Sequence, residues 1–129
     1  MIPAIQSLDH LVLTVADIDA TCAFYRRVLG FEVVIFRGNR KALTFGSQKI
    51  NLHEVGKEFD PKAEIPTPGS GDLCFLTETP IADVQRHLES CQVTVLMPPT
   101  QRTGATGPIL SLYFRDPDGN LIEVANRIG

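Results

Sequence analysis

The stretch Leu112-Tyr-Phe-Arg-Asp-Pro-Asp-Gly-Asn-Leu-Ile-Glu-Val124 decides the fold of this chain. Two runs of apolar and aromatic residues flank Asp116–Asn120, a dense cluster of turn formers, and this pattern predicts a β-hairpin. The second strand of that hairpin carries the acid Glu123 among apolar neighbours. An ionised carboxylate in such surroundings is costly unless it is paired or bound to a metal. Glu123 is therefore the first candidate for a functional residue.

Hydrophobic periodicity predicts the same order of elements, β-α-β-β-β, in each half of the chain. In the first half, Asp17 is the predicted N-cap of a helix that Gly30 ends. In the second half, Pro80 is predicted at the first helical position. The expected strands are 8–15, 31–36, 42–45 and 50–55, then 72–77, 93–97, 109–114 and 121–125. Residues 56–70 and Pro98–Pro108 are rich in proline and glycine and are predicted to be irregular.

The two halves align as an internal repeat of about 50–60 residues, a sign of two similar modules. A shift of 62 residues places Asp72 on His10, and a shift of 72 places Glu123 on Asn51. The ten-residue difference falls in the Pro98–Pro108 loop, where insertions are tolerated best. We expect a single 129-residue domain with module 1 at about 7–55, a linker at 56–71 and module 2 at about 72–126. The first and last strands of the modules then supply His10, Asn51, Asp72 and Glu123.

Composition excludes several classes of protein. A net charge of −3 without a basic run argues against nucleic-acid binding, and no apolar run is long enough to span a membrane. The first residues lack the pattern of a signal peptide. The three cysteines, Cys22, Cys74 and Cys91, lie in apolar patterns, so we expect reduced core residues in a cytoplasmic protein.

Three segments carry a family resemblance: Leu8–Val15 (LDHLVLTV), Phe24–Phe31 (FYRRVLGF) and Asp116–Glu123 (DPDGNLIE). With them, over about residues 7–126, the chain resembles the vicinal-oxygen-chelate superfamily, which includes glyoxalase I, methylmalonyl-CoA epimerase, extradiol dioxygenases and fosfomycin-resistance proteins. Within it, the chain is similar to the glyoxalase-domain-containing protein 5 branch, given Lys41–Leu43 (KAL), Lys49–Gly56 (KINLHEVG) and Arg102–Gly104 (RTG). The resemblance implies an α+β fold in which two tandem βαβββ modules form curved mixed sheets.

The resemblance also implies a divalent metal held by His10, Asn51, Asp72 and Glu123. His10 and Glu123 match the ligand types of the family, whereas Asn51 stands where relatives carry Glu or Gln and Asp72 where they usually carry His. His53 lies two residues after Asn51 and so faces the same side of a regular strand, where it is an alternative ligand or a base. The simpler alternatives are a structural His10, an ion pair of Glu123 with an arginine such as Arg115, and turn or backbone contacts for Asp72, Asn51 and His53.

The implied function is glyoxalase-like lyase or isomerase chemistry on a small oxygenated metabolite. One imidazole with carboxylates and an amide suits Ni²⁺, Co²⁺, Mn²⁺ or Mg²⁺, with Zn²⁺ and Fe²⁺ left open. The metal would chelate neighbouring substrate oxygens while a base moves a proton through an enediolate. Glu123, His53 and Tyr113 are the candidate catalytic residues. The partners expected are a small-molecule substrate and a second copy in a homodimer, without nucleic acid or membrane.

Two other functions remain open. Tyr113 matches the tyrosine of the extradiol dioxygenase signature, although the histidine expected upstream is missing, and this favours ring cleavage by Fe²⁺ and O₂ as an alternative. A metal-free binding or resistance protein is the other. Arg102 and Tyr113 are the candidate substrate-binding residues. For Cys74 a buried apolar role is predicted over a thiol ligand, and Gly104–Gly107 is predicted to be a flexible flap.

Overall fold

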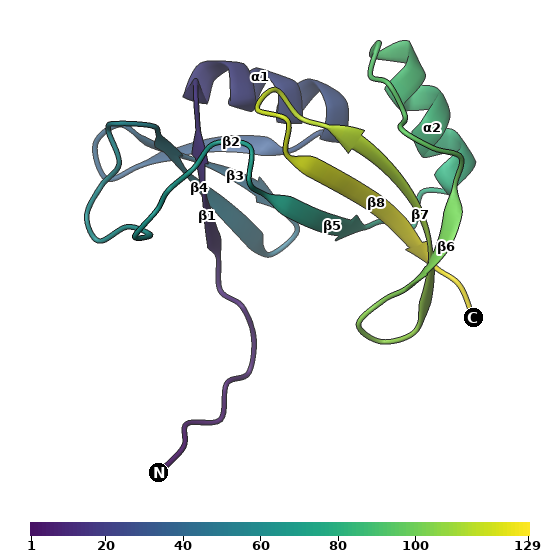
Figure 1. The fold of residues 1–129 in the computed structure, drawn as a ribbon, viewed down its shortest axis with the longest axis horizontal. Coiled ribbons are helices and arrows are strands. Elements are labelled where there is room, and N and C mark those ends of the chain that lie inside the picture. The colour runs from purple at the N-terminus through teal and green to yellow at the C-terminus, as the bar shows by residue number, and fades with distance from the viewer. The chain divides into compact units, whose positions relative to one another are not determined.

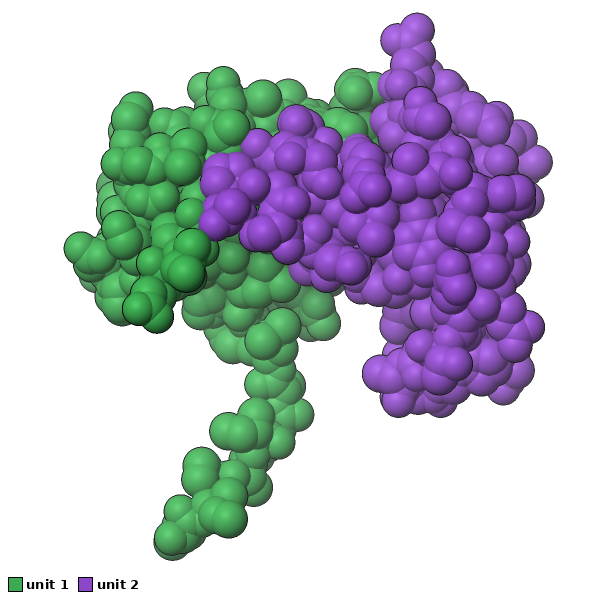
Figure 2. Space-filling view, viewed as in Figure 1, with its two compact units in different colours: residues 1–66 green, residues 67–129 purple.

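The computed structural model describes residues 1–129, which divide into two compact units, 1–66 and 67–129 (Figure 2). Each unit contains one βαβββ module, so the predicted α+β fold is confirmed (Figure 1). Unit 1 comprises β1 (Leu11–Val15), α1 (Ile18–Leu29), β2 (Glu32–Phe36), β3 (Arg40–Phe45) and β4 (Gln48–Glu54). Unit 2 comprises β5 (Asp72–Leu76), α2 (Ile81–Ser90), β6 (Thr100–Thr103), β7 (Pro108–Arg115) and β8 (Leu121–Arg127). Neither helix is long and apolar enough to cross a membrane.

The two sheets have the same mixed topology, β1-β4-β3-β2 and β5-β8-β7-β6, with the first and last strands parallel. Their registers show which residues are equivalent. Val12 pairs with Asn51 in unit 1, and Cys74 pairs with Glu123 in unit 2. These pairs differ by 62 and 72 residues, the shifts that the sequence repeat predicts. The repeat is therefore present in the strand pairing as well as in the order of the elements.

In each unit a helix covers one face of the sheet and leaves the other face open. The buried residues of α1 are Thr21, Cys22, Tyr25 and Val28, and the core of the sheet beneath it includes Leu13, Leu43 and Leu52. In unit 2, Ile81 and Leu88 of α2 are buried with Leu112, Phe114, Ile122 and Val124. Because side chains alternate along a strand, the residues between these apolar ones point to the open face. That alternation places Asn51 and Glu123 on open faces.

The helix ends follow the sequence closely at α1 and less closely at α2. The Asp17 side chain accepts a hydrogen bond from Ala20 N, and Gly30 has a φ of 69°, as the sequence predicts. Pro80, predicted at the first helical position, is instead the residue before the helix. The start of α2 is capped by Asn126 of β8, whose Oδ1 accepts a hydrogen bond from Ile81 N at 2.8 Å.

The hairpin that begins with β6 differs from the prediction. Residues 93–97, predicted as a strand, have no regular structure, and the predicted irregular loop instead contains β6, which pairs with residues 108–111. Leu96 N does donate to Tyr113 O at 2.9 Å. However, Pro98 and Pro99 follow and lack the N–H groups that a continuous ladder needs. Regular pairing therefore starts only at Thr100.

Candidate functional site

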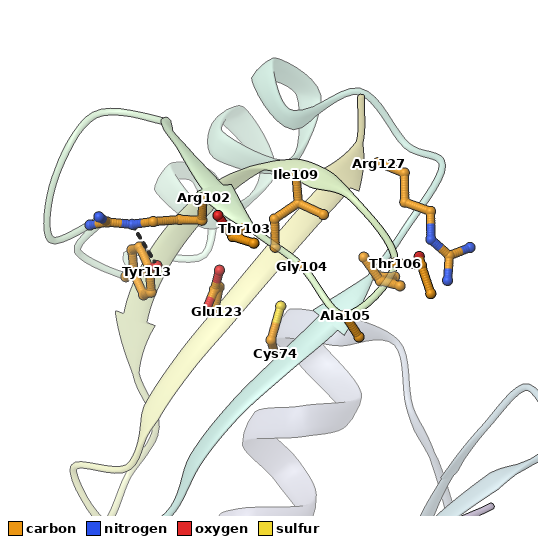
Figure 3. A pocket seen from close by; sticks show the side chains of 11 residues that line it. Cys74, Arg102, Thr103, Gly104, Ala105, Thr106, Ile109, Tyr113, Glu123 and Arg127 are labelled. Atoms are coloured by element: carbon orange, nitrogen blue, oxygen red, sulfur yellow. Dashed lines mark hydrogen bonds between the residues drawn. The ribbon is translucent and has the colours of Figure 1, made fainter. Parts of the chain in front are cut away.

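The open face of unit 2 contains a pocket of about 460 Å³ (Figure 3). Its floor includes Cys74 of β5, Glu123 of β8 and Tyr113 of β7. The segment from Arg102 to Thr106 forms a wall, and Arg127 lies at the end opposite Tyr113. A volume of this size is in the range of small-molecule sites.

Strand register explains why the three floor residues meet. Glu123 is the parallel partner of Cys74 and the antiparallel partner of Tyr113, so all three lie in one row across neighbouring strands. Directly paired residues have Cβ atoms about 5 Å apart and point to the same face. The sheet thus places a carboxylate between a thiol and a phenol.

Glu123 is held by a hydrogen bond and has no ion pair. Ser111, which is fully buried, donates from Oγ to Glu123 Oε2 at 2.5 Å. Arg115, considered above as a partner for the carboxylate, instead donates to Gly119 O at 3.5 Å. Sequence reasoning missed Ser111. The available signal was a serine two residues from Tyr113, and hence on the same face, in a mostly apolar strand.

Cys74 is exposed on this face, so the prediction that it is buried in the core is wrong. The alternation of β5 places Leu73 and Phe75, not Cys74, on the helix side. Partial desolvation in the pocket, together with the charge of Glu123 and a hydrogen bond to it, raises the pKa of the Cys74 thiol to about 11. The sulfur is therefore a protonated donor beside the carboxylate at neutral pH.

The two predicted substrate-binding residues are in contact. Arg102 Nε donates to Tyr113 Oη at 3.1 Å, and the guanidinium carbon lies 5.6 Å from the centre of the tyrosine ring. Arg102 Nη2 also lies 3.9 Å from Met97 Sδ. Neither partner is anionic, so the arginine charge is not neutralised within the unit.

In unit 1, Asn51 occupies the position equivalent to Glu123 and has an unusual environment. Its Oδ1 atom is buried and has no hydrogen-bond partner. Such an orphaned acceptor costs about 1–3 kcal/mol and usually marks a missing donor, water or ion. The side chain therefore offers an oxygen donor that no other group of the protein uses.

His10 and Asp72 are equivalent in the repeat, and both are exposed. His10 comes directly before β1, and Asp72 is the first residue of β5. His10 Nδ1 lies 2.9 Å from Asp9 Oδ2. A carboxylate bound to one ring nitrogen fixes the orientation of an imidazole and leaves the other nitrogen available, as is common for metal-binding histidines.

His53 lies on the open face of unit 1 beside an aromatic and a cationic side chain. The His53 and Phe59 rings meet edge to face at 5.7 Å, and the Arg40 guanidinium carbon lies 3.9 Å from the centre of the Phe59 ring. Desolvation, and then the charge of Arg40, lowers the pKa of His53 below its usual value of about 6.5. The imidazole is therefore neutral at pH 7.

The donors predicted to hold a metal divide between the units, with His10 and Asn51 in unit 1 and Asp72 and Glu123 in unit 2. No group of three or more His, Cys, Asp or Glu side chains is arranged to hold a metal ion in the structure. The donor chemistry nevertheless fits a divalent cation, because Asn51 Oδ1 is orphaned and Glu123 has no ion pair. Carboxylate, amide and imidazole donors suit Mn²⁺ and similar ions.

Comparison with known proteins agrees with this architecture. The model of the Glyoxalase/Bleomycin resistance protein/Dioxygenase superfamily matches residues 7–124. The chain is 57% identical to virulence protein STM3117 of Salmonella typhimurium over 96% of this chain and 86% of that protein. The crystal structure of STM3117 superimposes with a TM-score of 0.96, covering 98% of this chain and all of that one.

Two further relatives carry names related to function. Glyoxalase domain-containing protein RDO1 of Mycosarcoma maydis is 58% identical over 95% of this chain and 69% of that protein. An ethylmalonyl-CoA/methylmalonyl-CoA epimerase of Cereibacter sphaeroides is 32% identical over 93% of this chain and 97% of that protein. Proteins of the superfamily include glyoxalase, epimerase and fosfomycin-resistance enzymes; they bind small molecules, commonly bind divalent metals and often form dimers. This chain belongs to the Glyoxalase/Bleomycin resistance protein/Dioxygenase superfamily.

Proposed function

We propose that the protein is a divalent-metal-dependent lyase or isomerase that moves a proton on a small oxygenated substrate. The observation that carries the proposal is Glu123, a carboxylate in a pocket of about 460 Å³ that is held by the Ser111 hydroxyl and has no ion pair. A carboxylate that is oriented but not neutralised is available for a cation or a proton. The similarity to a named epimerase supports the same class of chemistry.

The proposed ligands are His10, Asn51, Asp72 and Glu123. Asn51 supplies an oxygen that has no partner in the protein, and Asp9 orients the imidazole of His10. When bound, a divalent ion would act as a Lewis acid that polarises a substrate oxygen. Ser111 and Cys74 orient the Glu123 carboxylate from below and beside it.

The candidate proton carriers are Glu123, His53 and Tyr113. The lowered pKa of His53 leaves its imidazole neutral at pH 7, as a base must be. Tyr113 Oη accepts a hydrogen bond from Arg102 Nε, so its own proton remains available for a substrate oxygen.

Solvent deuterium exchange tests this proposal. The purified protein would be stripped with a chelator, reloaded with Mn²⁺ or Ni²⁺, and mixed in D₂O with two probes, the hemithioacetal of methylglyoxal with glutathione and methylmalonyl-CoA. We expect metal-dependent deuterium incorporation at the carbon next to a carbonyl or hydroxyl group, detected by NMR. Glu123→Gln should abolish it, and Arg115→Gln, outside the pocket, should not. Exchange that is independent of metal, or unchanged in Glu123→Gln, would refute the proposal.

A ring-cleaving dioxygenase is the second candidate, because Tyr113 lines the same pocket as Glu123. Oxygen uptake by the Fe²⁺-loaded protein on a catechol would favour this function, and Tyr113→Phe should then slow the uptake. Binding of a small molecule with equal affinity before and after metal removal would favour a metal-free binding protein instead. The homodimer also remains a prediction, which sedimentation at micromolar concentration would test.

A further inference from the structure

Arg127 lies in the pocket without a partner for its charge. It is on β8 four residues after Glu123, and therefore on the same face of the strand. Its backbone pairs with Ile109 of β7, but its side chain makes no hydrogen bond or ion pair with another residue. Other cations of the chain do have acidic partners, as Lys41 has Asp19 and Lys57 has Glu54. Arg127 is exposed and lines the pocket, so its guanidinium is accessible to a ligand bound there.

The wall beside Arg127 is rich in hydrogen-bond donors. Thr106 lies next to the Arg127 side chain in the pocket (Figure 3), and Thr103 lines the same wall. Neither hydroxyl is engaged by another residue. The backbone turn behind them is closed by Gly104 N, which donates to Gly107 O at 2.8 Å. A Cβ at Gly104 would lie 2.8 Å from that oxygen and 2.9 Å from Ile109 Cγ2, so the close approach of this turn to Ile109 requires glycine at this position.

The charges of the pocket differ from those of the whole chain. The chain has a net charge of −3, yet the pocket residues include two arginines, Arg102 and Arg127, and one acid, Glu123. The two guanidiniums lie at opposite ends of the pocket, with Glu123 between them (Figure 3). Guanidinium groups with adjacent hydroxyl donors match the planar oxygens of a carboxylate or a phosphate.

We infer that Arg127 and Thr106 form a subsite for an anionic end group of the substrate. This inference rests on the proposed function, because it places the reacting part of the same molecule at Glu123. Four residues of a strand span about 13 Å. The substrate is therefore an elongated molecule whose carboxylate or phosphate lies roughly one such span from the oxygens that face Glu123.

A pair of ten-carbon probes tests the inference. Both 2-hydroxysebacate and 2-hydroxydecanoate have a 2-hydroxy acid at one end, but only the former has a carboxylate at the other. Binding to the protein as purified would be followed by ¹⁵N NMR, including the Arg127 side chain and the Thr106 amide. We expect Arg127→Gln to weaken the binding of 2-hydroxysebacate about tenfold, the usual effect of losing a charge-assisted hydrogen bond. The affinity for 2-hydroxydecanoate should not change. Arg115→Gln should change neither affinity.

Inorganic phosphate distinguishes the two kinds of anion. Competition by phosphate at Arg127 that is stronger than competition by acetate would identify the subsite as phosphate-selective, and the reverse would identify a carboxylate subsite. If Arg127→Gln lowers the affinity for both ten-carbon probes equally, the inference is overturned. The absence of any Arg127 or Thr106 shift with every probe would also overturn it.

The Glu123→Gln variant separates this inference from the proposed function. It should lose deuterium exchange but keep the Arg127-dependent difference between the ten-carbon probes, because the subsite does not need the Glu123 charge. If the wild-type protein catalyses deuterium exchange but Arg127→Gln affects both ten-carbon probes alike, the anion subsite alone is refuted. If Arg127→Gln weakens only 2-hydroxysebacate but the wild-type protein catalyses no exchange, the proposed reaction alone is refuted.

Discussion

Replacing Ser111 by alanine tests whether the orientation of Glu123 depends on the hydroxyl beneath it. Ser111 is fully buried, and its Oγ donates to Glu123 Oε2 at 2.5 Å. A hydrogen bond to a charged group contributes about 1.5–3 kcal/mol to stability. Because the carboxylate has no ion pair, no nearby cation compensates for the loss. We expect Ser111→Ala to lower the free energy of unfolding of the metal-free protein by about 2 kcal/mol.

A double-mutant cycle in urea measures this interaction directly. Ser111→Ala and Glu123→Met are made singly and together, since methionine matches the length of glutamate but accepts no strong hydrogen bond. The expected coupling energy is about 1.5 kcal/mol or more. Ser90→Ala is the matched control, because the exposed Ser90 hydroxyl donates to His87 O at 2.6 Å, and it should cost less than about 0.5 kcal/mol. A coupling energy below about 0.5 kcal/mol would refute the reasoning.

The same variant carries information about metal binding. A ligand that binds only the native state raises stability according to its concentration relative to Kd. Loss of a residue that orients a metal ligand typically weakens metal affinity about 10- to 100-fold. The stabilisation by excess Mn²⁺ should therefore be smaller in Ser111→Ala than in the wild type by about 1.4–2.7 kcal/mol. An equal stabilisation in both proteins would show that Ser111 does not orient a ligand.

Three further predictions follow from other contacts. Asp116→Ala should lower the free energy of unfolding, measured in urea, by about 3 kcal/mol, because the buried Asp116 carboxylate accepts three hydrogen bonds within its turn. A loss of stability below about 1 kcal/mol would contradict this expectation. Cys74, with its pKa raised to about 11, should react slowly with iodoacetamide at pH 8 and faster in Glu123→Gln. Mass spectrometry of the labelled peptide measures both rates, and equal rates would contradict the prediction. In an NMR titration, the midpoint of His53 should lie below pH 6.5. Arg40→Gln should raise this midpoint, because it removes a positive charge that lowers the pKa of His53. An unchanged midpoint would show that the charge of Arg40 has no such effect.

The order of the elements could be predicted from the sequence because local signals and the repeat agree. Asp17 and Gly30 predict the ends of α1 by their own chemistry. The repeat shifts of 62 and 72 residues predict the register of both parallel pairs, since equivalent residues occupy equivalent places in a sheet. The prediction of a strand at 93–97 was wrong, because it was based on the apolar pattern alone and did not consider the prolines after it, which interrupt pairing.

Most of the candidate site depended on contacts that local patterns do not encode. Glu123 was identifiable because an acid in an apolar strand is costly by itself. Ser111 was not, because its role appears only when β7 pairs with β8. Cys74 was assigned to the core from its apolar neighbours, although alternation alone would have placed it opposite Leu73 and Phe75. Arg127 had no signal other than its position four residues after Glu123.

The difference between the two modules explains why the pocket lies in unit 2. Ala42 and Tyr113 are equivalent, since they are the antiparallel partners of Asn51 and Glu123. In unit 1, β3 begins two residues before Ala42, whereas in unit 2, β7 begins five residues before Tyr113 and pairs with β6 along that extension. The extension supplies the pocket residues Arg102, Thr103, Thr106 and Ile109. The repeat thus determines where Glu123 lies, and the added length of one hairpin determines what surrounds it, so substitutions in this extension should change the ligand without changing the fold.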